Sequence, residues 1–230
     1  IERAIEIQQI PAPTFDESQR AEFVRRLFAE EGLKDVSVDE AGNVYGKRKA
    51  ESGKSEDKPL IISAHLDTVF PKETSLEVTR EGERIFGPGL GDNSLGVAAL
   101  FGLIWSIRER KIELGGDVWF VANTGEEGLG DLRGMKAVVE RFGADVLAYL
   151  VLEGLALGHV YYRAVGVKRY RVTARTKGGH SWSDYGQPSA VHELAKLIVQ
   201  LTSLDLPKEP RTTMNVGRVG GGTSINAIPA

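Results

Sequence analysis

Short apolar runs alternate with amphipathic stretches along the first two thirds of the chain. Three of these runs are rich in β-branched and aromatic residues and are bounded by glycine or polar clusters, which is typical of strands buried on both faces. They cover 60–64, 117–122 and 147–152. Helical spacing of apolar residues covers 18–31, about 94–110 and about 132–142. This alternation predicts an α/β domain with a mostly parallel sheet flanked by helices.

Local signals add detail to this domain. Gly32 is expected to end the first helix and Ser94 to cap the second. The pattern also predicts two strand pairs and a solvated polar loop. The pairs are 36–38 with 43–46 and 76–78 with 84–86, and the loop is 49–58.

The pattern changes after about residue 164. Apolar and polar residues alternate over 167–176 and 212–219, which is typical of half-exposed antiparallel strands, and 190–201 is an amphipathic helix. We therefore expect residues 1–164 to form a first domain and residues 165–230 a smaller α+β module.

Composition excludes several classes of protein. The 230 residues carry a net charge of −3 without a basic cluster, so no nucleic-acid partner is expected. There is no cysteine, which excludes disulfides and thiolate metal ligands and agrees with a cytoplasmic location. The longest apolar stretch, 96–107, is too short to span a bilayer. The chain begins at Ile1 rather than methionine, so a preceding segment is expected.

Each of the three apolar runs ends in side chains that bind metals well. His65 and Asp67 follow the first run, Glu126 and Glu127 the second, and Glu153 the third. The carboxyl ends of parallel strands meet at one edge of a sheet, where ligands bind. One imidazole and several carboxylates gathered there indicate a site for one or two divalent metals, and hence a metal-dependent hydrolase.

These residues also have structural interpretations. His65 is alternatively a buried, hydrogen-bonded histidine, and Glu153 a satisfied acid at a strand end. The pair Glu126–Glu127 is alternatively a solvated acidic turn, but adjacent acids repel each other and gain nothing structurally. If one of them binds metal, the other is free to take a proton from the attacking water.

Two further acids complete the predicted cluster. Asp92 lies in the glycine-rich loop 87–93, which lets its carboxylate approach an ion closely, although a helix N-cap is the alternative. A carboxylate can bridge two metals, which lie about 3.5–4 Å apart in two-metal aminopeptidase sites. Asp67 is placed to accept the second ring N–H of a metal-bound His65.

Other histidines and glycine-rich turns carry weaker signals. His180, in the loop 178–181, could stabilise an oxyanion, but a surface-loop histidine is an equal alternative. The turn 220–226 lacks the strand–loop–lysine arrangement of a phosphate cradle. His159 and His192 are expected to be structural or exposed.

Taken together, these segments resemble the zinc metallopeptidase family of glutamate carboxypeptidase, aminoacylase, acetylornithine deacetylase, succinyl-diaminopimelate desuccinylase and peptidase T. The matching segments occur in the family's order over nearly the whole chain. They are 63–69, 87–93 with 96–98, 125–128, 178–181 and 223–229.

The resemblance implies a fold, a reaction and a role for each residue. It implies a zinc-peptidase-like catalytic domain with a ferredoxin-like lid or dimerisation domain, two zinc ions that cobalt or manganese can replace, and hydrolysis of an amide bond in small peptides or N-acyl amino acids. Dimeric members pair through the lid. The implied metal ligands are His65, Asp92 as the bridge, Glu127 and Glu153. The other implied roles are Glu126 as general base, Asp67 as the residue that orients His65, His180 as a lid residue that reaches an active site, and Asn226 as a substrate contact.

The chain departs from the family at one point. The family takes its last metal ligand from a histidine near the C-terminus, whereas this sequence stops at Ala230, and neither His159 nor His192 lies in a matching context. We therefore expect an incomplete lid and an inactive chain that is part of a longer enzyme. The rival hypothesis is a binding or scaffold protein that keeps the fold without a working site.

Overall fold

The computed structural model describes residues 1–50, 58–154 and 157–230. Most of the predicted polar loop 49–58 therefore lies outside the described residues. The chain divides into two compact units, Ile1–Val160 and Tyr161–Ala230.

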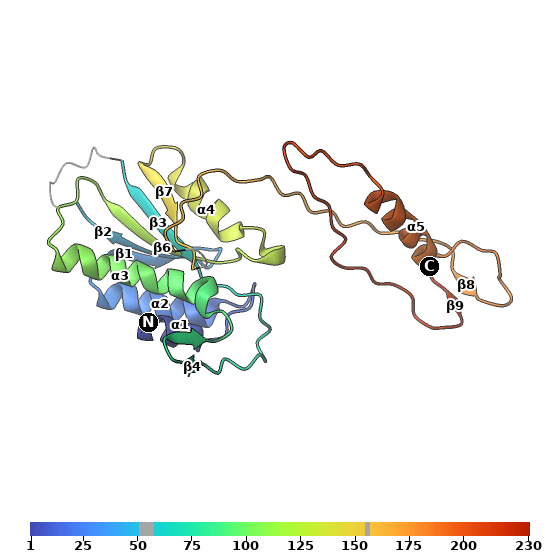
Figure 1. The fold of residues 1–230 in the computed structure, drawn as a ribbon, viewed down its shortest axis with the longest axis horizontal. Helices are drawn as coiled ribbons and strands as arrows, with labels where there is room; N and C mark the ends of the chain where they lie inside the picture. The colour runs from blue at the N-terminus through green and yellow to red at the C-terminus, as the bar shows by residue number, and fades with distance from the viewer. Residues whose placement is uncertain (51–57, 155–156) are drawn as a thin grey trace. The chain divides into compact units, whose positions relative to one another are not determined.

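A five-stranded sheet forms the centre of the first unit (Figure 1). Its order is β1 (Lys34–Val38), β2 (Val44–Arg48), β6 (Val118–Asn123), β3 (Leu60–His65) and β7 (Ala148–Val151). β3 pairs in parallel with both β6 and β7, whereas β1–β2 and β2–β6 are antiparallel. The predicted α/β domain and its first hairpin are thus confirmed, and the sheet is mixed because that hairpin joins one edge of the parallel strands.

Helices cover both faces of this sheet. The side chains of each buried strand alternate between the faces, so both faces are apolar and need covering. One face packs against α1 (Glu2–Gln8), α2 (Ser18–Glu30) and α3 (Leu95–Glu109), and the other against α4 (Arg133–Phe142). Ile62 and Phe120 point to the first cluster, and their neighbours Ile61 and Val121 to the second.

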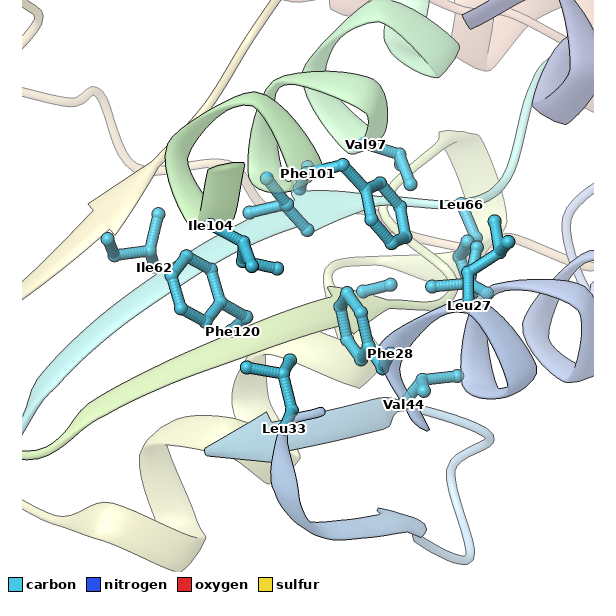
Figure 2. Packing of buried hydrophobic residues seen from close by; sticks show 14 of the residues in the cluster. Leu27, Phe28, Leu33, Val44, Ile62, Leu66, Val97, Phe101, Ile104 and Phe120 are labelled. Carbon is cyan, nitrogen blue, oxygen red and sulfur yellow. The ribbon is translucent and has the colours of Figure 1, made fainter. Parts of the chain in front are cut away.

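The larger cluster holds α2 and α3 against the sheet (Figure 2). Phe28 of α2 and Phe101 of α3 lie with ring centroids 5.3 Å apart, in the same cluster as Phe120 of β6. Each such side chain contributes about 1.5–3 kcal/mol when fully buried. This packing fixes both helices, and with them the loops at their ends.

Two local predictions are wrong. The first strand of the second hairpin is β4 (Thr79–Glu81), three residues later than 76–78, and it pairs with β5 (Arg84–Phe86). Gly82, with φ +61, opens a two-residue turn, and such a turn pairs the residues directly beside it. Ser94 precedes α3 but does not cap it through its side chain; Asn93 Oδ1 accepts the Gly96 N–H instead (3.0 Å).

The segment around α3 also differs from expectation. Counted with the preceding turn, Leu90–Glu109 is long and apolar enough to cross a membrane. Val97, Leu100 and Ile104 of this segment are nevertheless buried in the core of the first unit, as in the core helix of a soluble protein. Its length therefore carries little weight as evidence for a membrane span.

The second unit contains one long helix, α5 (Ala190–Thr202), which confirms the predicted amphipathic helix. Its strands β8 (Gly179–His180) and β9 (Ala227–Ile228) form a short antiparallel pair. The predicted strands 167–176 and 212–219, all described, are wrong because neither segment is in a strand. An alternating pattern marks residues suited to a sheet, but a strand also needs a neighbour for its backbone hydrogen bonds.

Candidate metal site

The ends of the three parallel strands bring most of the predicted site residues to one edge of the sheet. His65 at the end of β3 lies opposite Asn123 at the end of β6, and Ser63 lies opposite Val151 at the end of β7. Residues that directly follow these strands therefore lie close together.

His65 is the centre of this cluster. Its side chain is 2% exposed, and its Nε2 lies 3.0 Å from Asp92 Oδ1 and 3.7 Å from Glu153 Oε1. Within the described residues, both His65 Nε2 and Asp92 Oδ1 are buried without a hydrogen-bond partner. Because such buried polar atoms are costly unless they are paired, this arrangement suits a bound cation.

Two groups of side chains around His65 have the composition and spacing of a divalent-metal site. His65, Asp92 and Glu153 each offer an atom within 4.8 Å of the others, and so do His65, Glu126 and Glu127. One imidazole with carboxylates is a donor set that zinc, manganese and cobalt accept. The residues present therefore fit a divalent metal.

Asp67 connects two loops of the cluster. Its Oδ1 accepts the Glu126 N–H (2.9 Å) and its Oδ2 accepts the Glu127 N–H (3.0 Å) and the Thr14 hydroxyl (2.9 Å). His65 Nδ1 lies 3.0 Å from the Asp67 carbonyl oxygen and 3.5 Å from Oδ1. Asp67 thus contacts the imidazole mainly through its backbone, while its carboxylate is used to hold the glutamate pair.

The charges of the cluster shift its pKa values strongly. Burial lowers the pKa of His65, but the carboxylates of Asp67 and Glu153 outweigh burial and raise that pKa to about 10. Burial raises the pKa of Asp67, yet His65 and the amides of Glu126 and Glu127 outweigh it, so that pKa lies below its usual value. Burial, with help from neighbouring acids, raises the pKa values of Glu126 and Glu127.

Asp92 and Glu153 face each other because Asn93 ties their loops together. Asn93 Nδ2 donates to the carbonyl of Leu152 (2.9 Å), while its Oδ1 caps α3. The loops also meet at two glycines, since a Cβ on Gly154 would lie 1.7 Å from the Gly91 carbonyl oxygen. Asp92 itself lies in the turn η1 (Leu90–Ser94).

The two remaining predicted residues lie in the second unit. His180 and Asn226 are neighbours there, because β8 pairs with β9 and the Ser181 N–H donates to the Asn226 carbonyl (3.0 Å). The side chain of His180 is exposed and accepts the Trp182 N–H at Nδ1 (3.2 Å).

Comparison with known proteins identifies the family. The model of peptidase family M20/M25/M40 matches residues 61–228. This chain belongs to that family. A Peptidase M20 domain-containing protein of Schizosaccharomyces pombe is 31% identical over 82% of the chain, and the cytosol non-specific dipeptidase of Escherichia coli is 32% identical over 43%.

Solved structures of two peptidases share the fold. A tripeptidase from Staphylococcus aureus covers 99% of the chain at 21% identity with a TM-score of 0.65, and aminopeptidase PepT from Bacillus cereus covers 99% at 23% identity with a TM-score of 0.62. The chain spans 62% and 63% of the length of those two structures. Its match to the S. pombe relative covers 45% of that protein, and its match to the E. coli dipeptidase covers 22%. The resemblance drawn from the sequence motifs is therefore confirmed at the level of the family.

Sequence reasoning missed the residues that support the candidate site from outside it. Arg20 of α2 is 2% exposed and donates through Nη1 to the carbonyl of Leu66 (2.7 Å), the residue between His65 and Asp67. Burial lowers the pKa of Arg20 to about 10, while Asp67 opposes that shift. The available signal was a helical arginine on the same face as Val24 and Leu27, a place where a charge needs a buried partner.

The pKa of His65 gives the first prediction. In the metal-free chain the imidazole should titrate near pH 10 and remain protonated at pH 7. Metal ligation requires the neutral ring, so binding at pH 7 should release about one proton from His65 and tighten as the pH rises. Ring-nitrogen chemical shifts over a pH series, with His65→Gln to assign the signal, measure this, and a midpoint at or below 6.5 would contradict the electrostatic picture.

Proposed function

We propose that the chain is the metal-binding part of an M20 hydrolase that cleaves an amide bond in small peptides or N-acyl amino acids. The observation that carries the proposal is the buried His65, with Asp92 and Glu153 near one ring nitrogen and the Glu126–Glu127 pair beside it. The names of the relatives, among them a dipeptidase and a tripeptidase, support a peptide substrate.

We assign the metal ligands as the family resemblance implies. His65 and Glu153 would hold one zinc ion, Glu127 the other, and Asp92 would bridge both, with cobalt or manganese as substitutes. When bound, such ions lower the pKa of water and polarise a carbonyl oxygen. The approach of Asp92 and Glu153 to the same ring nitrogen supports the first of these assignments.

Glu126 is the proposed general base. Its neighbour Glu127 would be occupied by metal, which leaves the Glu126 carboxylate free to accept a proton from the attacking water and pass it to the leaving nitrogen. Partial burial raises the pKa of Glu126, which makes its carboxylate a stronger base. Asp67 would act indirectly, by orienting His65 and holding the backbone of Glu126.

We propose residues 1–164 as the catalytic domain and residues 165–230 as part of a ferredoxin-like lid through which two copies pair. His180 would donate to the developing oxyanion and Asn226 would contact the substrate. The pairing of His180 with Ala227, the residue after Asn226, and the bond from the Ser181 N–H to the Asn226 carbonyl support a shared task. A cytoplasmic location, without a nucleic-acid or membrane partner, completes the proposal. The rival hypothesis, a non-catalytic scaffold, is disfavoured by the intact glutamate pair and by relatives named as peptidases.

Glu126→Gln tests the proposed function. In the intact protein, we expect this substitution to lower turnover of dipeptides and acyl amino acids by about 10²–10⁴-fold, because the amide cannot accept the proton. Metal content should stay nearly unchanged, since Glu126 is not an assigned ligand. Turnover near that of the wild type would contradict the assignment of Glu126 as base.

The bridging role of Asp92 can be tested by metal content. Asp92→Ala should lose more metal than Glu153→Ala, because a bridging carboxylate serves two ions and Glu153 would serve one. Plasma emission spectroscopy after dialysis gives the stoichiometry of each variant. Equal losses would count against a bridge.

The ligand set also predicts how the 230 residues behave alone. His65 is the imidazole shared by both groups of candidate ligands among the described residues, so one ion of a pair would have carboxylate ligands without nitrogen. Carboxylates alone suit magnesium or manganese better than zinc. We expect weak zinc binding in calorimetric titration and no peptidase activity, and two tight zinc sites with measurable turnover would refute this.

A further inference from the structure

The loop that carries Glu126 is held in an unusual way. Four successive backbone N–H groups of residues 124–127 each donate to a side-chain oxygen from another part of the chain. These bonds are Thr124 to Asn43 Oδ1 (3.0 Å), Gly125 to Glu17 Oε1 (3.0 Å), Glu126 to Asp67 Oδ1 (2.9 Å) and Glu127 to Asp67 Oδ2 (3.0 Å). The direction of the Glu126 side chain therefore depends on residues far away in the sequence.

Glu17 differs from the other acceptors because it is also half of an ion pair. It is 4% exposed, and its Oε1 and Oε2 lie 3.1 Å and 3.0 Å from an Arg133 guanidinium nitrogen. Glu17 directly precedes α2, whereas Arg133 begins α4. The pair thus joins the start of α2 to the start of α4, beside residues 124–127, which we call the glutamate loop.

Arg133 holds Gly125 from its other side. The Arg133 backbone N–H donates to the Gly125 carbonyl (3.1 Å), and a Cβ on Gly125 would lie 2.3 Å from Arg133 Nε. Gly125 has φ +59, a conformation that favours glycine, so it can bend the chain while the guanidinium packs against it. The Glu17 carboxylate therefore holds the N–H of the residue that precedes Glu126, while the main chain of Arg133 holds its C=O.

A buried carboxylate is costly, and a buried ion pair is weak evidence for a contribution to stability. The contacts that this pair makes with Gly125 instead indicate a role in the geometry of residues 124–127. Glu17 points one oxygen at the Gly125 amide, and Arg133, whose Cζ lies 5.0 Å from the centre of the Phe15 ring, keeps that carboxylate in place.

We propose that Glu17 and Arg133 are positioning residues, which hold the loop 124–127 so that the Glu126 carboxylate points at the reacting atoms. This inference rests on the proposed function, in which Glu126 is the general base. It adds that the base is aligned by an ion pair that contacts neither metal nor substrate.

The test compares Glu17→Ala, Glu17→Gln and Arg133→Met in the intact protein with the control Glu22→Gln. Glu22 lies on α2, five residues after Glu17, and forms an exposed ion pair with Arg25 (2.7 Å). We expect Glu17→Ala and Arg133→Met to lower kcat by about 10- to 100-fold, the size expected when a catalytic group is misplaced by about 1 Å. KM should stay unchanged, and the control should match the wild type; kcat is compared at saturating metal, because the assigned ligand Glu127 lies in the same loop.

Glu17→Gln separates positioning from a merely structural role. Its amide oxygen can still accept the Gly125 N–H, so it should recover much of the kcat that Glu17→Ala loses. Hydrogen exchange of the amides of residues 125–127 should accelerate at least about tenfold in Glu17→Ala and Arg133→Met, and less in Glu17→Gln. If Glu17→Ala does not fold, Glu17→Gln and Arg133→Met carry the comparison.

The outcomes distinguish this inference from the proposed function. Faster amide exchange with unchanged kcat, while Glu126→Gln is inactive, would overturn the positioning role and leave the function standing. Reduced kcat with wild-type amide exchange would also overturn it, because the loop would not have moved. If Glu126→Gln keeps full activity, the proposed function fails. The positioning role then fails as well, because there would be no base to align. This holds even if amide exchange shows that the ion pair orders the loop.

Discussion

The carboxylate of Asp67 is the interaction on which the candidate site depends. It follows β3 and accepts two successive amides from the loop after β6, so one side chain holds two strand ends together. The same residue places its carbonyl beside Nδ1 of His65, which leaves Nε2 directed at Asp92 and Glu153. Without Asp67, no side chain would hold the imidazole and the glutamate pair in fixed positions relative to each other.

This arrangement concentrates charge that the fold must compensate. His65 is buried among five carboxylates, and its pKa of about 10 means that the metal-free imidazole carries a proton that partly balances them. A divalent cation would replace that proton and bind His65 Nε2 and Asp92 Oδ1, which lie 3.0 Å apart. The charges of the site thus favour the form with a bound cation over the metal-free form.

Much of the first unit could be predicted from the sequence, because its signals are local. Apolar runs predict β3, β6 and β7, and the rule that parallel strands end at one edge of a sheet predicts that His65, Asp67, Glu126 and Glu153 lie together. The second unit was predicted less well. The segments 167–176 and 212–219 alternate correctly for strands but have no paired neighbour, and pairing is not a local property.

The supporting residues could not be predicted because their partners are distant in sequence. Glu17 and Arg20 are three residues apart at the start of α2 and therefore lie on one face of it. Glu17 accepts a hydrogen bond from the Gly125 N–H, and Arg20 donates one to the Leu66 carbonyl. The start of one helix therefore fixes the loops after both β6 and β3. In the sequence they are ordinary charges of an amphipathic helix. The strand ends carry the candidate ligands, and the two buried side chains at the start of α2 fix the loops that position those ligands.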